Sequence, residues 1–259
     1  LNYSFYTTIA TGVADYAKTK GYSVIVASSE NDHESEIKFT HLFSTKDIKG
    51  AIIAPLVEGS SEIEHLFKLK MINYPFVLLE DVKGIQANVV AIDNIKAIKK
   101  AVKYLIDGGH TKIVHFAGPP ASSHTEERIE GFRYAFSESS LVFNNDMIVS
   151  IGSRHEESYS NTMAYFKSRP RSEYPTAIVC FNDQQALSVI TALKELDIKV
   201  PDDISIIGND DVAYAKLYPV PLTTISAPQY EIGRRAAEIL IKNIESHTLL
   251  PPERVILQT

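Results

Sequence analysis

Short apolar runs alternate with amphipathic stretches almost from one end of the chain to the other. In the first amphipathic stretch, Phe5 to Lys20, residues Ile9, Val13 and Ala17 recur at a spacing of four and predict a helix. The same pattern predicts helices near residues 34–44, 62–70, 95–106, 126–136, 157–167, 184–196 and 230–245. Continuous apolar runs predict strands at 22–27, 50–56, 75–79, 89–92, 112–117, 147–151, 177–181, 204–208 and 255–257.

Strands that are apolar throughout and separated by helices indicate parallel sheets covered by helices on both faces. The connections between such strands are right-handed. There are too many strand–helix units for one small sheet, so an α/β fold of two doubly wound lobes fits better than a closed barrel. Periodicity alone leaves the barrel open.

Composition indicates a globular protein and argues against several other classes. The 259 residues are 44% hydrophobic and 22% charged, which is ordinary for a globular protein. The net charge of −6 argues against a basic nucleic-acid-binding surface within this stretch. Cys180 is the single cysteine, so an intrachain disulfide framework is excluded. No apolar run approaches membrane-spanning length, and no secretory signal is visible.

Common catalytic and cofactor motifs are absent from the sequence. It has no Gly-x-Gly-x-x-Gly, phosphate-binding loop or Gly-x-Ser-x-Gly motif, and its histidines have no zinc-protease spacing. Cys180 lies in an apolar run and is expected to pack as a small core residue. We therefore expect neither a cofactor nor a metal, and no enzymatic activity.

Polar residues follow several predicted strands, at the edge where open α/β sheets bind ligands. They form the pairs Glu80-Asp81, Asp93-Asn94, Asn182-Asp183 and Asp210-Asp211. Carboxylates and amides in this position suit the paired hydroxyls of a sugar. The ordinary alternative is helix capping, which we expect for Asn94 and Asp183 because each directly precedes a helix.

Several short motifs together resemble the effector-binding core of LacI/GalR transcription regulators, over nearly the whole chain. In order, the motifs are Val90–Asn94 (VAIDN), Gly109–Ile113 (GHTKI), Gly118-Pro119, Arg128–Phe132 (RIEGF), Pro175–Ile178 (PTAI) with Asn182-Asp183, Val200–Gly208 (VPDDISIIG), Asp210-Asp211, Pro221–Ile225 (PLTTI) and Gly233–Ala236 (GRRA). Each motif alone is weak, and their order and spacing make the resemblance specific.

The resemblance implies a periplasmic-binding-protein-like fold, in which two Rossmann-like lobes are joined by three crossovers and the effector binds in the cleft. The crossovers are expected near Ile92-Asp93, Ile225–Pro228 and Pro252–Ile256. One lobe would hold residues 1–92 and 226–253, and the other residues 93–225 and 254–259.

Carried over position by position, the family's ligand contacts fall on residues of both lobes. Arg128 would reach sugar oxygens, and Asn182 and Asp210 would take paired hydroxyls. The aromatic pair Phe5 and Tyr6 would pack on the apolar sugar face. Further contacts are expected from Glu80, Asp93 and Arg154.

The chain departs from the family pattern at three positions in or next to the expected ligand contacts. Arg154 stands where an aromatic is frequent, which would favour an acidic or phosphorylated sugar if it lines the cleft. Asp81 replaces a common basic residue, and Ala227 a common polar one.

The resemblance also predicts that the family's first strand and DNA-binding headpiece precede Leu1. Without that strand, we expect a rearranged N-terminal lobe or pairing of the gap with another chain.

Three functions are weighed, and the stretch from Val200–Ser205 (VPDDIS) to Leu222–Ile225 (LTTI) favours the first. The first is the effector-sensing and dimerisation domain of a cytoplasmic bacterial regulator, which would reach operator DNA through the headpiece and have no contact with a membrane. The second is a periplasmic sugar-binding protein of a transporter. The third is an enzyme on a doubly wound fold, for which the sequence offers no catalytic constellation. Which sugar is bound, and whether it induces or corepresses, does not follow from the sequence.

Overall fold

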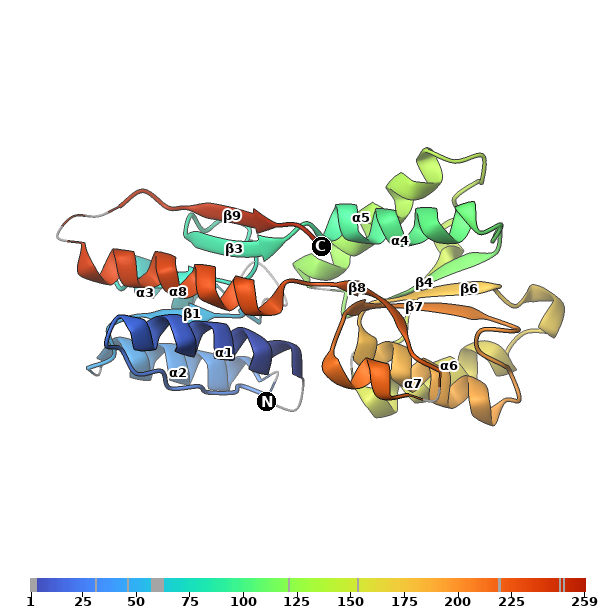
Figure 1. Cartoon of the computed structure of the whole chain (residues 1–259), viewed down its shortest axis with the longest axis horizontal. Helices are drawn as coiled ribbons and strands as arrows, with labels where there is room; N and C mark the ends of the chain where they lie inside the picture. The colour runs from blue at the N-terminus through green and yellow to red at the C-terminus, as the bar shows by residue number, and fades with distance from the viewer. Residues whose placement is uncertain are drawn as a thin grey trace. The chain divides into compact units, whose positions relative to one another are not determined.

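The computed structural model of the chain contains two compact units, each with its own parallel sheet (Figure 1). It describes residues 4–30, 32–45, 47–56, 63–120, 122–152, 154–218, 220–246, 248 and 250–259. The first unit comprises Leu1–Ile92 and Pro228–Gln258, and the second comprises Asp93–Ala227 and Thr259. These two parallel, helix-covered sheets confirm the expected α/β class.

The first unit holds a sheet of order β1-β2-β3-β9. Its strands are β1 (Ala51–Ile53), β2 (Phe76–Leu78), β3 (Asn88–Ile92) and β9 (Arg254–Leu257), all parallel. Its helices are α1 (Ser4–Thr19), α2 (His33–Thr45), α3 (Glu64–Met71) and α8 (Gln229–Glu245). The predicted helix at 62–70 begins at Glu62, which lies outside the described residues.

Close packing of α1 on α8 depends on glycine. A Cβ on Gly233 would lie 1.9 Å from the carbonyl oxygen of Ile9, and one on Gly12 would lie 2.1 Å from that of Tyr230. Because both contacts are with backbone, no side-chain rearrangement could make room for a larger residue.

Two predictions for the first unit are wrong. Residues Tyr22–Ala27 form no strand, and Val24, Ile25 and Val26 are 38%, 71% and 48% exposed. A strand needs a paired neighbour, and no described strand pairs with the edge of β1 opposite β2. Residues 254–257, expected in the other lobe, pair with β3 in register Val89 with Arg254, so their backbone hydrogen bonds place them in the first unit's sheet.

The second unit has a parallel sheet of order β5-β4-β6-β7-β8. The strands are β4 (Ile113–Ala117), β5 (Ile148–Ser150), β6 (Ala177–Cys180), β7 (Ser205–Asp210) and β8 (Thr223–Ser226). The helices α4 (Asn94–Asp107) and α5 (Ser123–Ser137) cover one face of this sheet, and α6 (His155–Lys167) and α7 (Asp183–Glu195) cover the other (Figure 1). Short 3-10 turns lie at Asn145–Met147, Arg171–Glu173 and Ala213–Leu217.

One hydrophobic cluster of the second unit lies between the sheet and helices α4 and α5, and buried residues of α6 and α7, such as Phe166 and Leu193, pack on the other face. Ile98, Val102 and Leu105 of α4 are buried, as the helical spacing predicted. They join Phe132 and Phe136 of α5 in a cluster with the central strands. Among the described helices, none combines the length and the apolar composition that a membrane span requires.

Candidate functional site

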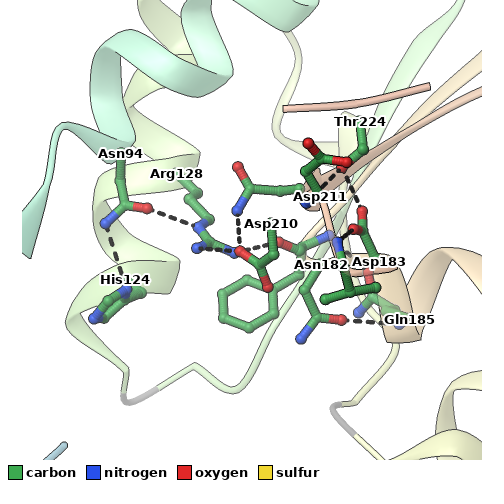
Figure 2. Close-up of polar contacts among 12 residues, drawn as sticks. Asn94, His124, Arg128, Asn182, Asp183, Gln185, Asp210, Asp211 and Thr224 are labelled. Atoms are coloured by element: carbon green, nitrogen blue, oxygen red, sulfur yellow. Dashed lines mark hydrogen bonds and ion pairs between the residues drawn. The ribbon is translucent and has the colours of Figure 1, made fainter. Parts of the chain in front are cut away.

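Polar side chains gather where β6 and β7 end in the second unit (Figure 2). The carboxyl ends of parallel strands share one edge of a sheet, which brings Asn182, shortly after β6, near Asp210, the last residue of β7. Arg128 reaches the same place from α5. Three of the residues that the sequence predicted are thus brought together.

Arg128 is only 4% exposed, and its guanidinium is held on several sides. Its Nε donates to Asn94 Oδ1 at 3.0 Å, and Nη1 donates to the carbonyl oxygen of Phe181. Nη2 lies 3.7 Å from Asp210 Oδ1, and the guanidinium carbon lies 4.4 Å from the centre of the Phe181 ring. A buried charge needs such partners, so the arginine is fixed before any ligand arrives.

The motif around Arg128 brings α5 close to α4. A Cβ on Gly131 would lie 2.4 Å from the carbonyl oxygen of Ile95, so only glycine permits this approach. The adjacent Phe132 is fully buried and anchors the helix in the core. Glycine and phenylalanine together therefore place Arg128 within reach of Asn94.

The helix caps lie one residue earlier than predicted. Asp93, not Asn94, caps α4 by accepting from Lys96 N at 2.9 Å, and Asn182, not Asp183, caps α7 by accepting from Gln185 N at 2.8 Å. Only the residue just before the first helical turn has the non-helical backbone that aims its side chain at these amides. Asn94 and Asp183 are consequently available for other contacts.

Asn94 is a residue of the candidate site that the sequence interpretation missed. It is 2% exposed, and its Nδ2 donates to Glu127 Oε2 at 2.7 Å while its Oδ1 accepts from Arg128. Figure 2 shows it between His124 and Arg128. Two polar residues in a row at a helix start were the available signal, because only one of them can cap.

Gln185 was also missed, although it fixes three strand ends at the site. Its Nε2 donates to the carbonyl oxygens of Ala117 at 3.2 Å and Gly152 at 2.9 Å. Its Oε1 accepts from Phe181 N at 2.8 Å. Phe181 in turn lies against Arg128, and a Cβ on Gly118 would lie 2.7 Å from its ring. Gln185 is 1% exposed, so all these contacts are shielded from water.

Asp210 is 4% exposed and lies in an acidic surrounding. Asn209 Nδ2 donates to its Oδ1 at 2.6 Å. Asp183 and Asp211 lie nearby, and Lys216 Nζ is 3.4 Å from Asp211 Oδ1. Arg128 faces this group of carboxylates, so the site carries more negative than positive charge.

The remaining predicted residues are Arg154 on the second unit and Phe5, Tyr6 and Glu80 on the first. Arg154 is exposed at the start of α6, and its side chain does not cap that helix. Phe5 and Tyr6 lie on α1 with ring centres 5.2 Å apart, and Tyr6 is 43% exposed. Glu80 is half-buried after β2, and its neighbour Asp81 accepts from Arg254 Nη2 at 2.6 Å.

Metal and thiol chemistry find little support here. In the parts of the chain that the structure describes, no three His, Cys, Asp or Glu side chains are placed to hold a metal ion. Cys180 is buried, and burial raises the pKa of its thiol far above the usual range. A thiol in that state is a poor nucleophile.

Asp183 makes the stability of the ligand-free protein depend on pH. Burial, aided by Asp210 and Asp211, raises the pKa of its carboxyl to about 6, although hydrogen bonds from Thr224 and Val212 oppose the shift. The folded state therefore binds this proton more tightly than the unfolded state. The resulting stabilisation is complete below about pH 4 and is lost as the pH rises to about 6.

We expect Asp183→Asn to remove this dependence. The unfolding free energy of wild type minus that of the variant should fall by about 2–3 kcal/mol between pH 4 and pH 7. Urea unfolding at each pH measures it. Taking the difference cancels the opposite titration of His115, whose pKa burial lowers to about 4. A difference that stays constant with pH would contradict the prediction.

Comparison with known proteins identifies relatives of this chain. A model of the periplasmic binding protein-like domain matches residues 102–259. The chain is 31% identical over 242 residues to the HTH-type transcriptional repressor PurR of Vibrio vulnificus, in an alignment that covers 93% of this chain and 71% of that protein.

Solved structures share the fold. The transcription regulator CcpA of Lactococcus lactis matches with a TM-score of 0.86 at 24% identity, covering 98% of this chain and 91% of that one. A LacI family transcriptional regulator from Enterococcus faecium, solved with bound ribose, matches with a TM-score of 0.81 at 23% identity, covering 100% and 92%. The matched repressor and both of these structures are named as regulators of transcription.

Proposed function

Since the chain belongs to the LacI/GalR family of transcription regulators, whose effector-binding core it forms, we propose that its effector is a neutral sugar bound at Arg128, Asn182 and Asp210. The observation that carries this proposal is the buried, prearranged Arg128 beside Asp210. A fixed guanidinium donates to ring and hydroxyl oxygens, while a carboxylate and an amide accept from pairs of hydroxyls. The ribose bound to the regulator from Enterococcus faecium is consistent with this chemistry.

Charge favours a neutral effector over an acidic or phosphorylated one. The guanidinium of Arg128 already contacts Asn94, the Phe181 carbonyl and Asp210. An added anion would meet three carboxylates, those of Asp183, Asp210 and Asp211. Among the described ion pairs of these carboxylates, Lys216 is the second cation besides Arg128, and its Nζ pairs with Asp211. Arg154, which is exposed at the start of α6, would supply a further cation if it lined the site.

The remaining predicted contacts belong to the same proposal. Phe5 and Tyr6 offer an aromatic pair suited to the apolar face of a sugar, and Glu80 offers a further acceptor. Asp93 is engaged with the start of α4 through Lys96 N, which leaves it a smaller part in ligand binding.

The family membership favours a cytoplasmic regulator over a transporter's periplasmic sugar-binding protein. The similar PurR protein is named as an HTH-type repressor. We include in the proposal that the protein acts as a homodimer and that it regulates transcription through an operator-binding headpiece. Binding of the effector would then shift the protein between states with different affinity for DNA.

A thermal-shift panel tests the sugar proposal. D-ribose and D-glucose represent neutral sugars, D-ribose 5-phosphate an anionic one, and adenine a planar heterocycle. A ligand at a hundred times its dissociation constant stabilises a protein by about 2.7 kcal/mol, which shifts the melting temperature by several degrees. We expect a shift with a neutral sugar and a smaller one with its phosphate.

Other outcomes of the panel would contradict the proposal in different ways. A larger shift with D-ribose 5-phosphate would mean that the charge argument is wrong. A shift with adenine alone would replace the sugar by a planar base. Asp81→Asn provides a matched control, because this partly exposed carboxylate is engaged by Arg254 and its loss should not affect the panel.

A further inference from the structure

The backbone at the end of β7 adopts a conformation that side chains rarely permit. Asp210 has φ of +120° and Asp211 has φ of +56°, so two successive residues other than glycine have positive φ. Such a backbone is strained and persists only where its surroundings hold it. Asp210 is also a predicted ligand contact, so whatever holds this turn also sets the position of its carboxylate.

The carboxylate of Asp183 contacts both sides of this turn. Its Oδ2 accepts from Val212 N at 2.9 Å, directly after the two residues of positive φ. Its Oδ1 accepts from the Thr224 hydroxyl on β8 at 2.5 Å, and that hydroxyl is 3.4 Å from Asp211 N. Figure 2 shows Asp183, Asp211 and Thr224 grouped in this way. The turn is thereby fastened to α7 and to β8.

The packing around Asp183 leaves room for its buried carboxylate. The residue is fully buried, and a Cβ on Gly208 would lie 2.2 Å from Oδ1, so only glycine on β7 admits the carboxylate. Capping of α7 does not account for Asp183, because Asn182 provides the cap. Burying a carboxylate beside Asp210 and Asp211 is unfavourable, so its retention here needs another reason.

We propose that Asp183 is a positioning residue, which holds the Asp210–Asp211 turn in its positive-φ conformation and so keeps the Asp210 carboxylate beside Arg128. This inference rests on the proposed function of the Arg128 site. The titratable groups that face Asp183 are Asp210, Asp211, Cys180 and Tyr214. Ionised Asp183 accepts both hydrogen bonds at once, whereas an asparagine has a single acceptor oxygen to share between them.

Hydrogen exchange of the Val212 amide tests the proposal without any ligand. Asp183→Asn should speed exchange of this amide at least tenfold, because its acceptor is weakened and the turn relaxes. The Ala186 amide, which donates to Asn182 O at 3.0 Å on α7, should exchange at its wild-type rate. Unchanged exchange at Val212 would overturn the proposal. A parallel rise at Val212 and Ala186 would also overturn it, since that indicates general loosening of the core.

Two further variants keep the test decisive. Thr224→Val removes the hydroxyl and preserves the branched shape, so it serves if Asp183→Asn fails to fold. It should speed exchange at Val212 several-fold and leave Ala186 unchanged, and no change at Val212 would overturn the proposal. Asp203→Asn is the matched control, because Asp203 Oδ2 accepts from Lys199 N at 2.8 Å in a separate exposed turn. It should affect exchange at Lys199 and not at Val212.

Sugar titration separates this inference from the proposed function. If D-ribose or D-glucose binds the wild type, Asp183→Asn should weaken that affinity at least tenfold. Unchanged affinity in a folded variant would overturn the inference. If neither sugar binds, the proposed effector is wrong, while the exchange rates of Val212 and Ala186 still decide whether Asp183 holds the turn.

Discussion

Arg128→Ala is expected to lower the melting temperature of the ligand-free protein by roughly 10 °C and to abolish sugar binding. The truncation leaves the buried carboxylate of Asp210 without its cation and the Phe181 carbonyl without its donor. Removing one partner of a buried ion pair costs about 3–5 kcal/mol, and each kcal/mol shifts the melting temperature by about 2–4 °C at this size. Thermal unfolding followed by circular dichroism measures the first effect.

Arg133→Ala provides a matched control for that experiment. Arg133 lies on the same helix, is exposed, and contacts the ring of Phe143 at 5.5 Å. Its removal should cost about 1 kcal/mol or less, since an exposed cation–π contact contributes little. If Arg128→Ala melted as the control does, the buried network around Arg128 would contribute nothing to the fold. If it melted early and still bound sugar, Arg128 would be structural and not a ligand contact.

Gly131→Ala is expected to destabilise the protein by about 1–3 kcal/mol and to weaken sugar binding, although residue 131 contacts no ligand in the proposal. The added methyl group would meet the backbone of Ile95, so α5 must move away from α4. That movement lengthens the 3.0 Å hydrogen bond between Arg128 Nε and Asn94 Oδ1. Urea unfolding and sugar titration of the same preparation measure the two effects.

Gly108→Ala is the matched control, because it makes the same change at the end of α4. There the nearest atom to a new Cβ is the carbonyl oxygen of Leu105 at 3.3 Å, a contact that a small shift relieves. We expect wild-type sugar affinity for this variant. Full affinity in Gly131→Ala would show that Arg128 tolerates the separation of its helices, and the explanation of the arginine–glycine–phenylalanine motif would then be wrong.

Hydrophobic periodicity predicted most of the fold, because burial on a helix or strand leaves a local pattern. The α4 face is an example: Ile98, Val102 and Leu105 are buried as their spacing indicated. Pairing between strands leaves no such pattern. The apolar run at Tyr22–Ala27 has strand composition, yet it has no neighbour to pair with in the described structure, and Arg254–Leu257 pairs with β3 for reasons invisible in its own sequence.

Strand-end positions and family motifs were sufficient to predict part of the candidate site. Asn182 and Asp210 come together because parallel strands end at one edge, and Arg128, found through its family motif, reaches them from α5. The residues that support them were missed, since Asn94, Gln185 and Asp183 act through contacts far apart in the sequence. Asp183 was predicted to cap a helix. The preceding residue, Asn182, provides that cap, and Asp183 instead accepts a hydrogen bond from Val212 N. Local capping rules are less reliable than strand-end geometry when polar residues occur in pairs.

The edge of β1 that no described strand pairs with could promote self-association of the protein at high concentration. Residues Ala51–Ile53 present backbone groups that no described strand pairs with, and the run Val24–Val26 of the same unit exposes apolar surface. An edge of this kind is a template for any extended segment of similar composition, including one from an identical molecule. Association through this edge would involve the first unit, whereas Arg128, Asn182 and Asp210 lie in the second.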